Sequence, residues 1–273
     1  MKNKASTIIL FVVFLIGLSL LLYPSVSDYW NSFRQSRVIS SYSQAVAGMD
    51  DEEYEQLWAE AQSYNRLLHT QQNGFSTSSE MKEQYDSLLN PGNDGVMGYI
   101  EIPSINVKLP IYHGTEDAEL QVGVGHLEWT SLPVGGVGTH CALSGHRGLP
   151  SAKLLSNLDQ MKEGDVFYLR ILGNTLTYEV DQIRIVDPED VSQLKVEEGK
   201  DFCTLVTCTP YGVNTHRLLV RGQRIENPDQ IADVRVTADA IQIEPIFVAP
   251  LVATPVLLML LVVLLVYTRK KKK

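Results

Sequence analysis

From Gly98 to Ile225 the sequence is a succession of short runs rich in β-branched and aromatic residues, separated by glycine and proline. Such runs, with turn signals like Gly173-Asn174 between them, are typical of a closed barrel or a sandwich and not of an alternating βαβ fold. We therefore predict a mainly β domain with short helices near residues 116–122 and 151–158. The seven expected strands cover residues 98–102, 107–111, 139–143, 166–172, 175–186, 202–209 and 216–225.

Two amphipathic helices are expected ahead of this domain. Residues 51–69 carry apolar side chains at helical spacing, with Asp50 or Asp51 available as the N-cap. A second helix is expected over residues 79–89, where Asn90-Pro91-Gly92 ends it. The polar loop between the two helices contains a single aromatic side chain, Phe75.

Both ends of the chain are apolar and carry basic residues. Residues 8–22 follow Lys2 and Lys4 and are typical of either a signal-peptide core or a short membrane anchor. Residues 246–267 contain no charge and are long enough to cross a hydrocarbon core of about 30 Å as a helix. The basic tail 269–273 follows at once. By the positive-inside rule we expect both termini in the cytoplasm and the region between them on the outer face of the cell membrane.

The region between the two apolar segments is strongly acidic. It contains all 32 aspartates and glutamates but only 16 of the 23 lysines and arginines, which leaves an excess of 16 carboxylates. Such a field disfavours polyanions, so nucleic acid is not an expected partner. A cationic partner, such as a protein surface that presents lysine, is compatible with it.

The sequence contains three cysteines, Cys141, Cys203 and Cys208, and none of them shows C-x-x-C spacing. With no H-E-x-x-H motif or carboxylate cluster either, we expect no disulfide framework, no metal site and no cofactor. Cys141 and Cys203 are expected in the core, because cysteine packs in strands as a small hydrophobe. A thiol left free outside the cell needs a reason, which directs attention to Cys208.

Cys208 ends a predicted strand on the face that also presents Val206, and a turn returns the chain so that Arg217 can lie beside it. A guanidinium favours the thiolate or binds an oxyanion that develops on a substrate carbonyl. A histidine must then transfer the proton. The residue pattern does not choose among the six candidates, which are His69, His113, His126, His140, His146 and His216.

Four blocks resemble the sortases, cysteine transpeptidases of Gram-positive cell surfaces. They are "TLVTCTPYGVNTHRLLVRG" from Thr204, "LSGHRGLPSAKLL" from Leu143, "GVMGYIEIPSINVKLPIYHGT" and "GVGHLEWTSLPVGG". The resemblance implies a closed eight-stranded sortase-type β-barrel. It also implies that Cys208 is the nucleophile, His146 the general acid and base, and Arg217 the stabiliser of the substrate or oxyanion.

The N-terminal helical extension and the C-terminal membrane helix resemble those of class C, or pilin-polymerising, sortases. Such enzymes cleave an LPxTG-like sorting signal between Thr and Gly and transfer the acyl group from cysteine to a lysine amine of a pilin subunit. They commonly carry a lid with an Asp-Pro-aromatic tripeptide, where this chain has Asn73-Gly74-Phe75. We therefore expect a lid in which Phe75 can plug the pocket but the latching carboxylate is missing.

Two alternatives remain open at this point. A housekeeping sortase would keep the chemistry but attach surface proteins to a peptidoglycan precursor. A non-enzymatic, membrane-anchored surface protein would end in a similar apolar segment and basic tail, although no LPxTG-like pentapeptide precedes Ile246. The expected organisation is a signal peptide or anchor (1–24), a helical N-terminal lid region (25–95), the barrel (96–227), a stalk (228–245), a transmembrane helix (246–267) and a cytoplasmic tail (268–273).

Overall fold

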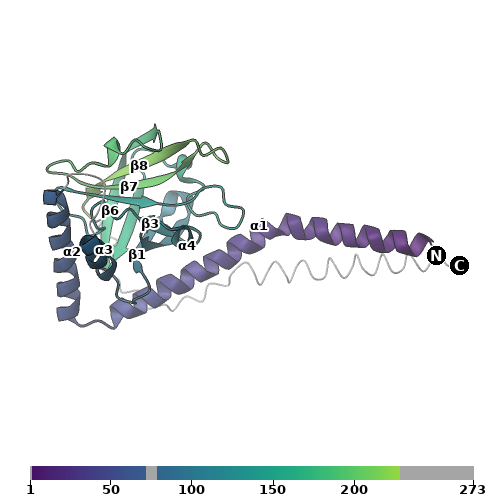
Figure 1. Cartoon of the computed structure of the whole chain (residues 1–273), viewed down its shortest axis with the longest axis horizontal. Coiled ribbons are helices and arrows are strands. Elements are labelled where there is room, and N and C mark those ends of the chain that lie inside the picture. Colours follow the sequence, from purple (N-terminus) through teal and green to yellow (C-terminus); the bar gives the residue numbers. More distant parts are fainter. Residues whose placement is uncertain (1, 72–78, 228–273) are drawn as a thin grey trace. The chain divides into compact units, whose positions relative to one another are not determined.

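The computed structural model describes residues 2–71 and 79–227, with side chains at 11–69 and 81–227. Its strands form a closed eight-stranded barrel in the order β1-β2-β3-β4-β7-β8-β6-β5 (Figure 1). The pairs β2–β3 and β4–β7 are parallel, and the other six are antiparallel. The strands are β1 (Val96–Ile102), β2 (Val107–His113), β3 (Val124–His126), β4 (Thr139–Ser144), β5 (Val166–Ile171), β6 (Asn174–Val186), β7 (Asp201–Thr209) and β8 (His216–Ile225).

All seven predicted strands are present, and the barrel prediction is confirmed. The sequence analysis missed β3, which is only three residues long and too short to show an alternating pattern. Gly125 in β3 must be glycine for a packing reason, because an added Cβ would lie 2.2 Å from the carbonyl oxygen of Gly114. A small residue there reads as a turn signal, although it marks a close approach of two backbones.

The helix predicted over residues 151–158 is wrong. This segment consists of turns and an isolated bridge between Leu149 and Ala152, and only the 3₁₀ turn η2 (Leu158–Gln160) follows it. Leu154 has a φ of 41°, in the left-handed region that an α-helix excludes. Side chains of α1 (Lys2–Ala47) form hydrogen bonds with the backbone of Ser151 and Lys153 in place of helical partners.

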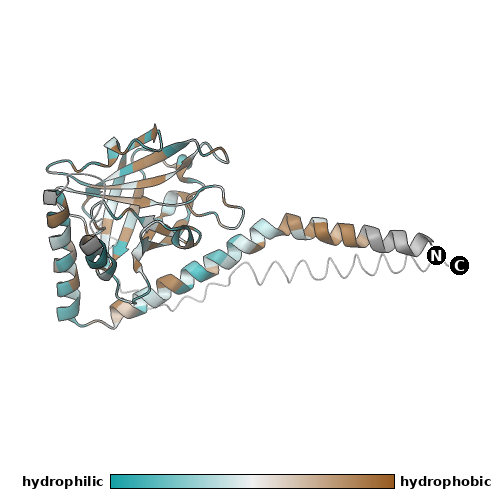
Figure 2. Cartoon of the chain, viewed as in Figure 1, coloured by the Kyte–Doolittle hydropathy of each residue, from teal (hydrophilic) through white to brown (hydrophobic). Residues whose placement is uncertain are grey.

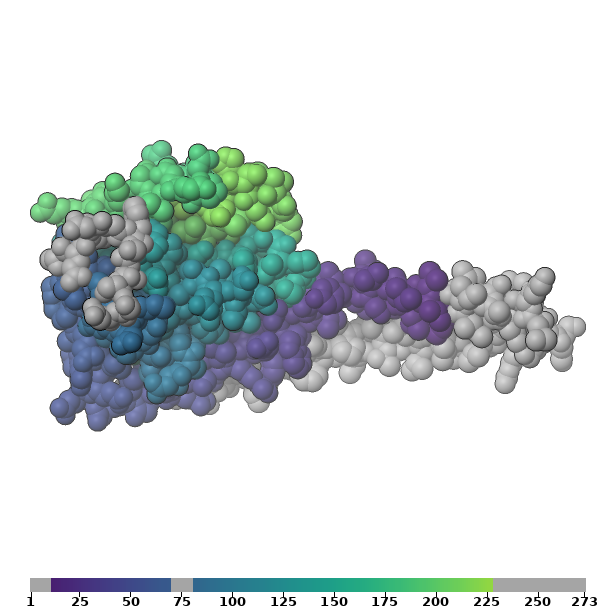
Figure 3. All heavy atoms as spheres, viewed as in Figure 1, coloured from purple at the N-terminus to yellow at the C-terminus, as the bar shows by residue number. Residues whose placement is uncertain are grey.

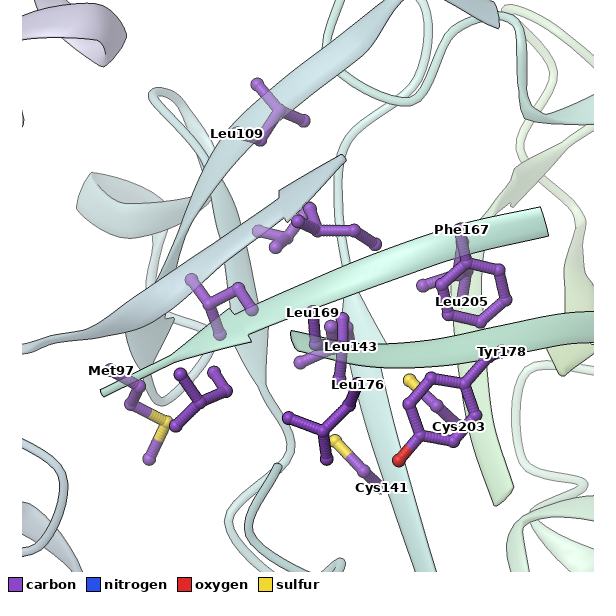
Figure 4. Close-up of a cluster of buried hydrophobic side chains, with 14 of the residues drawn as sticks. Met97, Leu109, Cys141, Leu143, Phe167, Leu169, Leu176, Tyr178, Cys203 and Leu205 are labelled. Carbon is purple, nitrogen blue, oxygen red and sulfur yellow. The ribbon is translucent and has the colours of Figure 1, made fainter. Parts of the chain in front are cut away.

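The barrel interior is filled by apolar side chains that alternate along the strands. Leu143, Phe167, Leu169 and Leu205 are all fully buried there. Figure 4 shows Cys141 and Cys203 among them, on neighbouring strands whose register pairs the two residues. The predicted core positions of these two cysteines are therefore confirmed.

The N-terminal helices pack on the outside of the barrel (Figure 3). In α1 (Lys2–Ala47), the hydroxyl of Tyr42 donates to the carbonyl of Met97 at 2.9 Å and accepts the amide of Leu172 at 2.7 Å. In α2 (Asp51–Gln71), the side-chain amide of Asn65 donates to the carbonyl of Leu132 at 3.1 Å and accepts the amide of Leu132 at 2.7 Å, so these two bonds attach α2 to the barrel domain. The remaining helical elements are α3 (Ser79–Ser87), α4 (Asp117–Leu120), η1 (Pro103–Ile105) and η3 (Ser192–Leu194).

The predicted helices before the barrel are confirmed, and Asp50 caps α2 by accepting the amide of Glu53 at 2.8 Å. Among the described residues, α1 is long and apolar enough to cross a membrane. Its exposed side chains between residues 11 and 26 are mostly apolar, and the part that contacts the barrel is more polar (Figure 2). The lid loop with Phe75, the stalk, the C-terminal helix and the basic tail lie outside the described residues.

Candidate active site

Cys208 lies near the end of β7 on the outer face of the barrel. The residues before and after Val206 point inward, since Leu205 belongs to the interior core, whereas Val206 belongs to a separate cluster on the outside. Cys208 follows Val206 by two positions and therefore shares the outer face. It is half-buried, in contrast to the fully buried Cys203.

Arg217 is the direct cross-strand partner of Cys208 in the antiparallel pair β7–β8. The predicted neighbourhood of these two residues is therefore confirmed. The guanidinium of Arg217 donates to the carbonyl oxygens of His216, at 3.2 Å, and Asn214, at 3.5 Å. These contacts place the guanidinium against the β7–β8 loop, at the edge of the site.

His146 reaches the same edge through the parallel pair β4–β7. The register pairs Ser144 with Val206, and the amide of Gly145 continues the ladder by donating to the carbonyl of Val206 at 3.0 Å. The hydroxyl of Thr207 adds a bond of 2.8 Å to the carbonyl of Gly145. His146 and Cys208 each follow this register pair by two positions, so they leave the barrel at the same end of the parallel pair β4–β7.

A cleft of about 160 Å³ adjoins this edge. Three buried members of the outer cluster line it, Leu194, Val206 and Leu219, and Ala142 is the fourth buried member of that cluster. Arg217 lines one side, and Asp190 from the β6–β7 segment lines another. The cleft therefore combines apolar side chains with one cationic and one anionic side chain.

His140 fixes the β6–β7 segment that covers the cleft. Its Nδ1 lies 2.8 Å from the carbonyl oxygen of Lys195, and its Nε2 lies 2.7 Å from the hydroxyl of Thr204. Burial lowers the pKa of His140, so the imidazole is neutral at pH 7. Because a carbonyl oxygen only accepts, Nδ1 carries the proton and Nε2 accepts the Thr204 hydroxyl.

The other candidate histidines serve different places. His126 is fully buried, with its Nδ1 3.0 Å from the hydroxyl of Tyr85 on α3. Burial lowers the pKa of His113, whose ring nitrogens contact the carbonyls of Gly95 and Leu88. The residue pattern alone does not distinguish His126 and His113 from His146 as proton carriers, but their contacts with α3 and with backbone carbonyls give them structural roles.

Two features of this edge had no local sequence signal. Leu194 lies in a 3₁₀ turn, where no periodic pattern marks it as a cleft residue. Arg147 contacts both the segment after His146 and the end of β7. Within residues 2–71 and 79–227, no group of three His, Cys, Asp or Glu side chains is arranged to hold a metal ion.

The sequence was compared with protein-family profiles and with known proteins, and both comparisons give the same family. A sequence profile described as the sortase domain matches residues 100–225. Sortase D of Bacillus subtilis (strain 168) is 31% identical over 138 residues, which are 50% of this chain and 67% of that protein.

Solved structures show the same similarity over a longer part of the chain. Sortase C1 of Streptococcus agalactiae is 50% identical with a TM-score of 0.68, and the match covers 70% of this chain and all of that one. Sortase C of Streptococcus pneumoniae, whose structure is described with its pilin substrate specificity, is 43% identical with a TM-score of 0.62. That match covers 70% of this chain and 97% of that one.

Proposed function

This chain belongs to the sortase family of cysteine transpeptidases, and from that premise we propose that it polymerises pilin subunits, with Cys208, His146 and Arg217 as its catalytic residues. The observation that carries the proposal is the meeting of three strand ends. The register pairs Cys208 with Arg217, and the parallel pair of Ser144 with Val206 supports a position for His146 near the same edge. The likeness to class C sortases supports the choice of pilin as substrate.

In the first proposed step, the Cys208 thiol gives its proton to His146, and its sulfur attacks the carbonyl carbon of threonine in an LPxTG-like sorting signal. Arg217 donates to the carbonyl oxygen as it gains negative charge, because a guanidinium offers fixed donors without itself losing a proton. His146 protonates the departing glycine amine as the peptide bond breaks. The products are a thioester on Cys208 and a released peptide that begins with glycine.

In the second proposed step, a lysine amine of another pilin attacks the thioester. His146 takes the proton from the amine, an isopeptide bond forms, and the sulfur leaves as the regenerated thiol. The excess of carboxylates in the external region favours the approach of a cationic acceptor. The cleft beside Arg217 supplies an apolar floor for the leucine and proline of the sorting signal.

We also propose that the enzyme acts on the outer face of the cell membrane. The apolar half of α1 follows Lys2 and Lys4, and residues 246–267 precede a basic tail, so both termini fit a cytoplasmic location. The unbroken helix from the apolar half to the part that contacts the barrel supports retention of residues 1–24 as an anchor.

The test uses the full-length protein in detergent micelles with a purified pilin that carries an LPxTG sorting signal. We expect a thioester adduct on Cys208 and pilin–pilin isopeptide bonds by mass spectrometry, both lost in Cys208→Ala. Resolution of the adduct by a glycine-based amine but never by pilin lysine would indicate the wall-anchoring alternative. Absence of any adduct with sorting peptides would contradict the proposal.

A further inference from the structure

We propose that Arg147 is a positioning residue that holds His146 against Cys208. Arg147 directly follows His146, and one of its donors reaches Thr209, which directly follows Cys208. A single side chain therefore joins the neighbours of the two reacting residues. This inference rests on the proposed roles of Cys208 and His146.

The contacts of Arg147 connect three segments of the chain. Its Nε donates to the carbonyl of Ser156 at 3.1 Å, and one terminal nitrogen lies 3.4 Å from the hydroxyl oxygen of Thr209. The other terminal nitrogen forms an ion pair with Asp159. Its guanidinium also lies over the ring of Tyr211, 5.7 Å from the centroid. The planar fork of arginine allows one group to meet these partners at once.

The guanidinium is unusual in its burial, with only 6% of the Arg147 side chain exposed, although Asp159 is 48% exposed. Removing a cation from water is costly unless hydrogen bonds compensate it. Here the compensation comes from groups on both sides of the site. The hydrogen bond to Thr209 therefore ties the His146 segment to the end of β7, and the ion pair with Asp159 ties the same guanidinium to η2.

The segment that carries His146 has little regular structure to hold it otherwise. Beyond Ser144 the chain leaves β4, and the carbonyl of His146 accepts one backbone bond, from Leu155 at 3.2 Å. Gly148 has a φ of 78°, and the ring of Tyr211 lies 3.3 Å from the place where a Cβ would stand. A loop of this kind depends on side-chain contacts for its position.

The positioning role predicts an effect on the reaction that is larger than the effect on the fold. A displacement of about 1 Å at a reacting group costs on the order of 10²-fold in rate, so we expect Arg147→Met to lower kcat by about that factor with KM little changed. Arg147→Lys keeps the charge but not the fork, and should recover only part of the loss. Asp159→Asn removes the ion pair at a half-exposed position and should show a smaller loss in a protein that still folds.

Arg170 provides a matched control on the far strand β5. It also pairs with a carboxylate, bonds a threonine hydroxyl and lies by a tyrosine ring, through Glu101, Thr175 and Tyr168. Arg170→Met removes the same kinds of contact away from Cys208. It should change the thermal midpoint but leave kcat unchanged.

The decisive measurement is the rate at which iodoacetamide alkylates Cys208 as a function of pH, in the full-length protein in micelles. His146→Ala removes the proposed imidazole neighbour of the thiol, so we expect it to alter this profile. Arg147→Met should change the profile in the same direction, and the double variant should match His146→Ala alone. Arg170→Met should retain the profile of the unsubstituted protein.

An additional shift in the double variant, or an Arg147→Met profile equal to that of the unsubstituted protein, would overturn the positioning role. If His146→Ala leaves both transpeptidation and the alkylation profile unchanged, the proposed role of His146 fails, and the inference fails with it. If His146→Ala abolishes transpeptidation but Arg147→Met does not reduce it, only the inference about Arg147 fails.

Discussion

The two faces of β7 give cysteine opposite surroundings within five residues of one another. Cys203 points into the barrel, where burial raises the pKa of its thiol well above the ordinary value and keeps it neutral. Cys208 points outward, is half-buried, and lies opposite Arg217. The same residue type is thus a packing group on one face and a candidate nucleophile on the other. Strand alternation alone makes the difference.

The largest expected effect comes from the outer cysteine. Cys208→Ala should abolish transpeptidation, because no other thiol lies on this face in the described part of the chain. Its thermal midpoint should stay close to that of the unsubstituted protein. The measurement is thioester formation with a sorting peptide, followed by mass spectrometry.

Cys203→Ala is the matched control on the inner face. It should retain transpeptidation per folded molecule but lose about 1 kcal/mol of stability, because a buried sulfur leaves a small void. Loss of activity in well-folded Cys203→Ala would break the contrast between the two faces.

The next effect compares two leucines that contribute to the two clusters. Leu205→Ala should destabilise the protein by about 2–5 kcal/mol, because the closed barrel cannot collapse onto the cavity. Leu194→Ala should cost less, because its cluster has only four buried members and adjoins an open cleft. Denaturant unfolding measures both.

The two leucines should also differ in catalysis. Leu194 lines the cleft, so its loss should raise KM for the sorting peptide, whereas Leu205→Ala should leave KM unchanged under conditions where it remains folded. An equal effect of both changes on KM would mean that the cleft floor is not specific to the outer face.

Arg217→Lys should lower kcat/KM by about 10²-fold, since an ammonium cannot reproduce the planar fork of a guanidinium. Arg221, on the same face of β8, is a suitable control because its fork binds Asp181 with two bonds, of 3.0 and 2.8 Å. Arg221→Lys should leave kcat/KM unchanged. Steady-state kinetics with a sorting peptide compare the two, and equal losses would remove any special role for Arg217.

The Cys208–Arg217 neighbourhood could be predicted because it depends on local rules. Strand alternation assigns the faces, and the turn after Thr209 returns the chain as the antiparallel partner. The choice of His146 from the residues alone was not possible. It depends on a parallel pairing between Ser144 and Val206, which are far apart in sequence and joined by no local pattern.

The errors have equally specific causes. The helix predicted over 151–158 fails because Leu154 is left-handed and because neighbouring segments bond the backbone of this loop. In α1, Asn31 donates to the carbonyl of Ser151 at 2.9 Å, and Asp28 accepts the amide of Lys153 at 2.7 Å. Periodicity reports one segment at a time, so it cannot anticipate contacts made from more than a hundred residues away.

The smallest expected effect concerns pH. It distinguishes the outer face, where a histidine holds the segment between β6 and β7, from the barrel interior, which is held by apolar packing. The outer segment, residues 191–195, is held by His140 through the carbonyl of Lys195. Burial lowers the pKa of His140 in the folded protein below its ordinary value of 6.5. The unfolded chain therefore binds the proton more readily than the folded one. Stability is fully present above about pH 6.5 and is lost as the pH falls below it, by about 1.4 kcal/mol for each unit between the two pKa values.

Protonation of His140 should loosen the outer segment before it affects the barrel interior. The added proton sits on Nε2, which can then no longer accept the Thr204 hydroxyl, while Arg221 opposes the new charge and Glu197 and Asp181 favour it. At lowered pH, protection from hydrogen exchange relative to the intrinsic rate should fall first over residues 191–195, and the β7 amides should remain protected. His140→Gln should reduce this local dependence, whereas part of the pH dependence of global stability should remain, since burial also lowers the pKa of His113. A uniform loss of protection over both regions would show that residues 191–195 have no attachment of their own, and that the two faces open together.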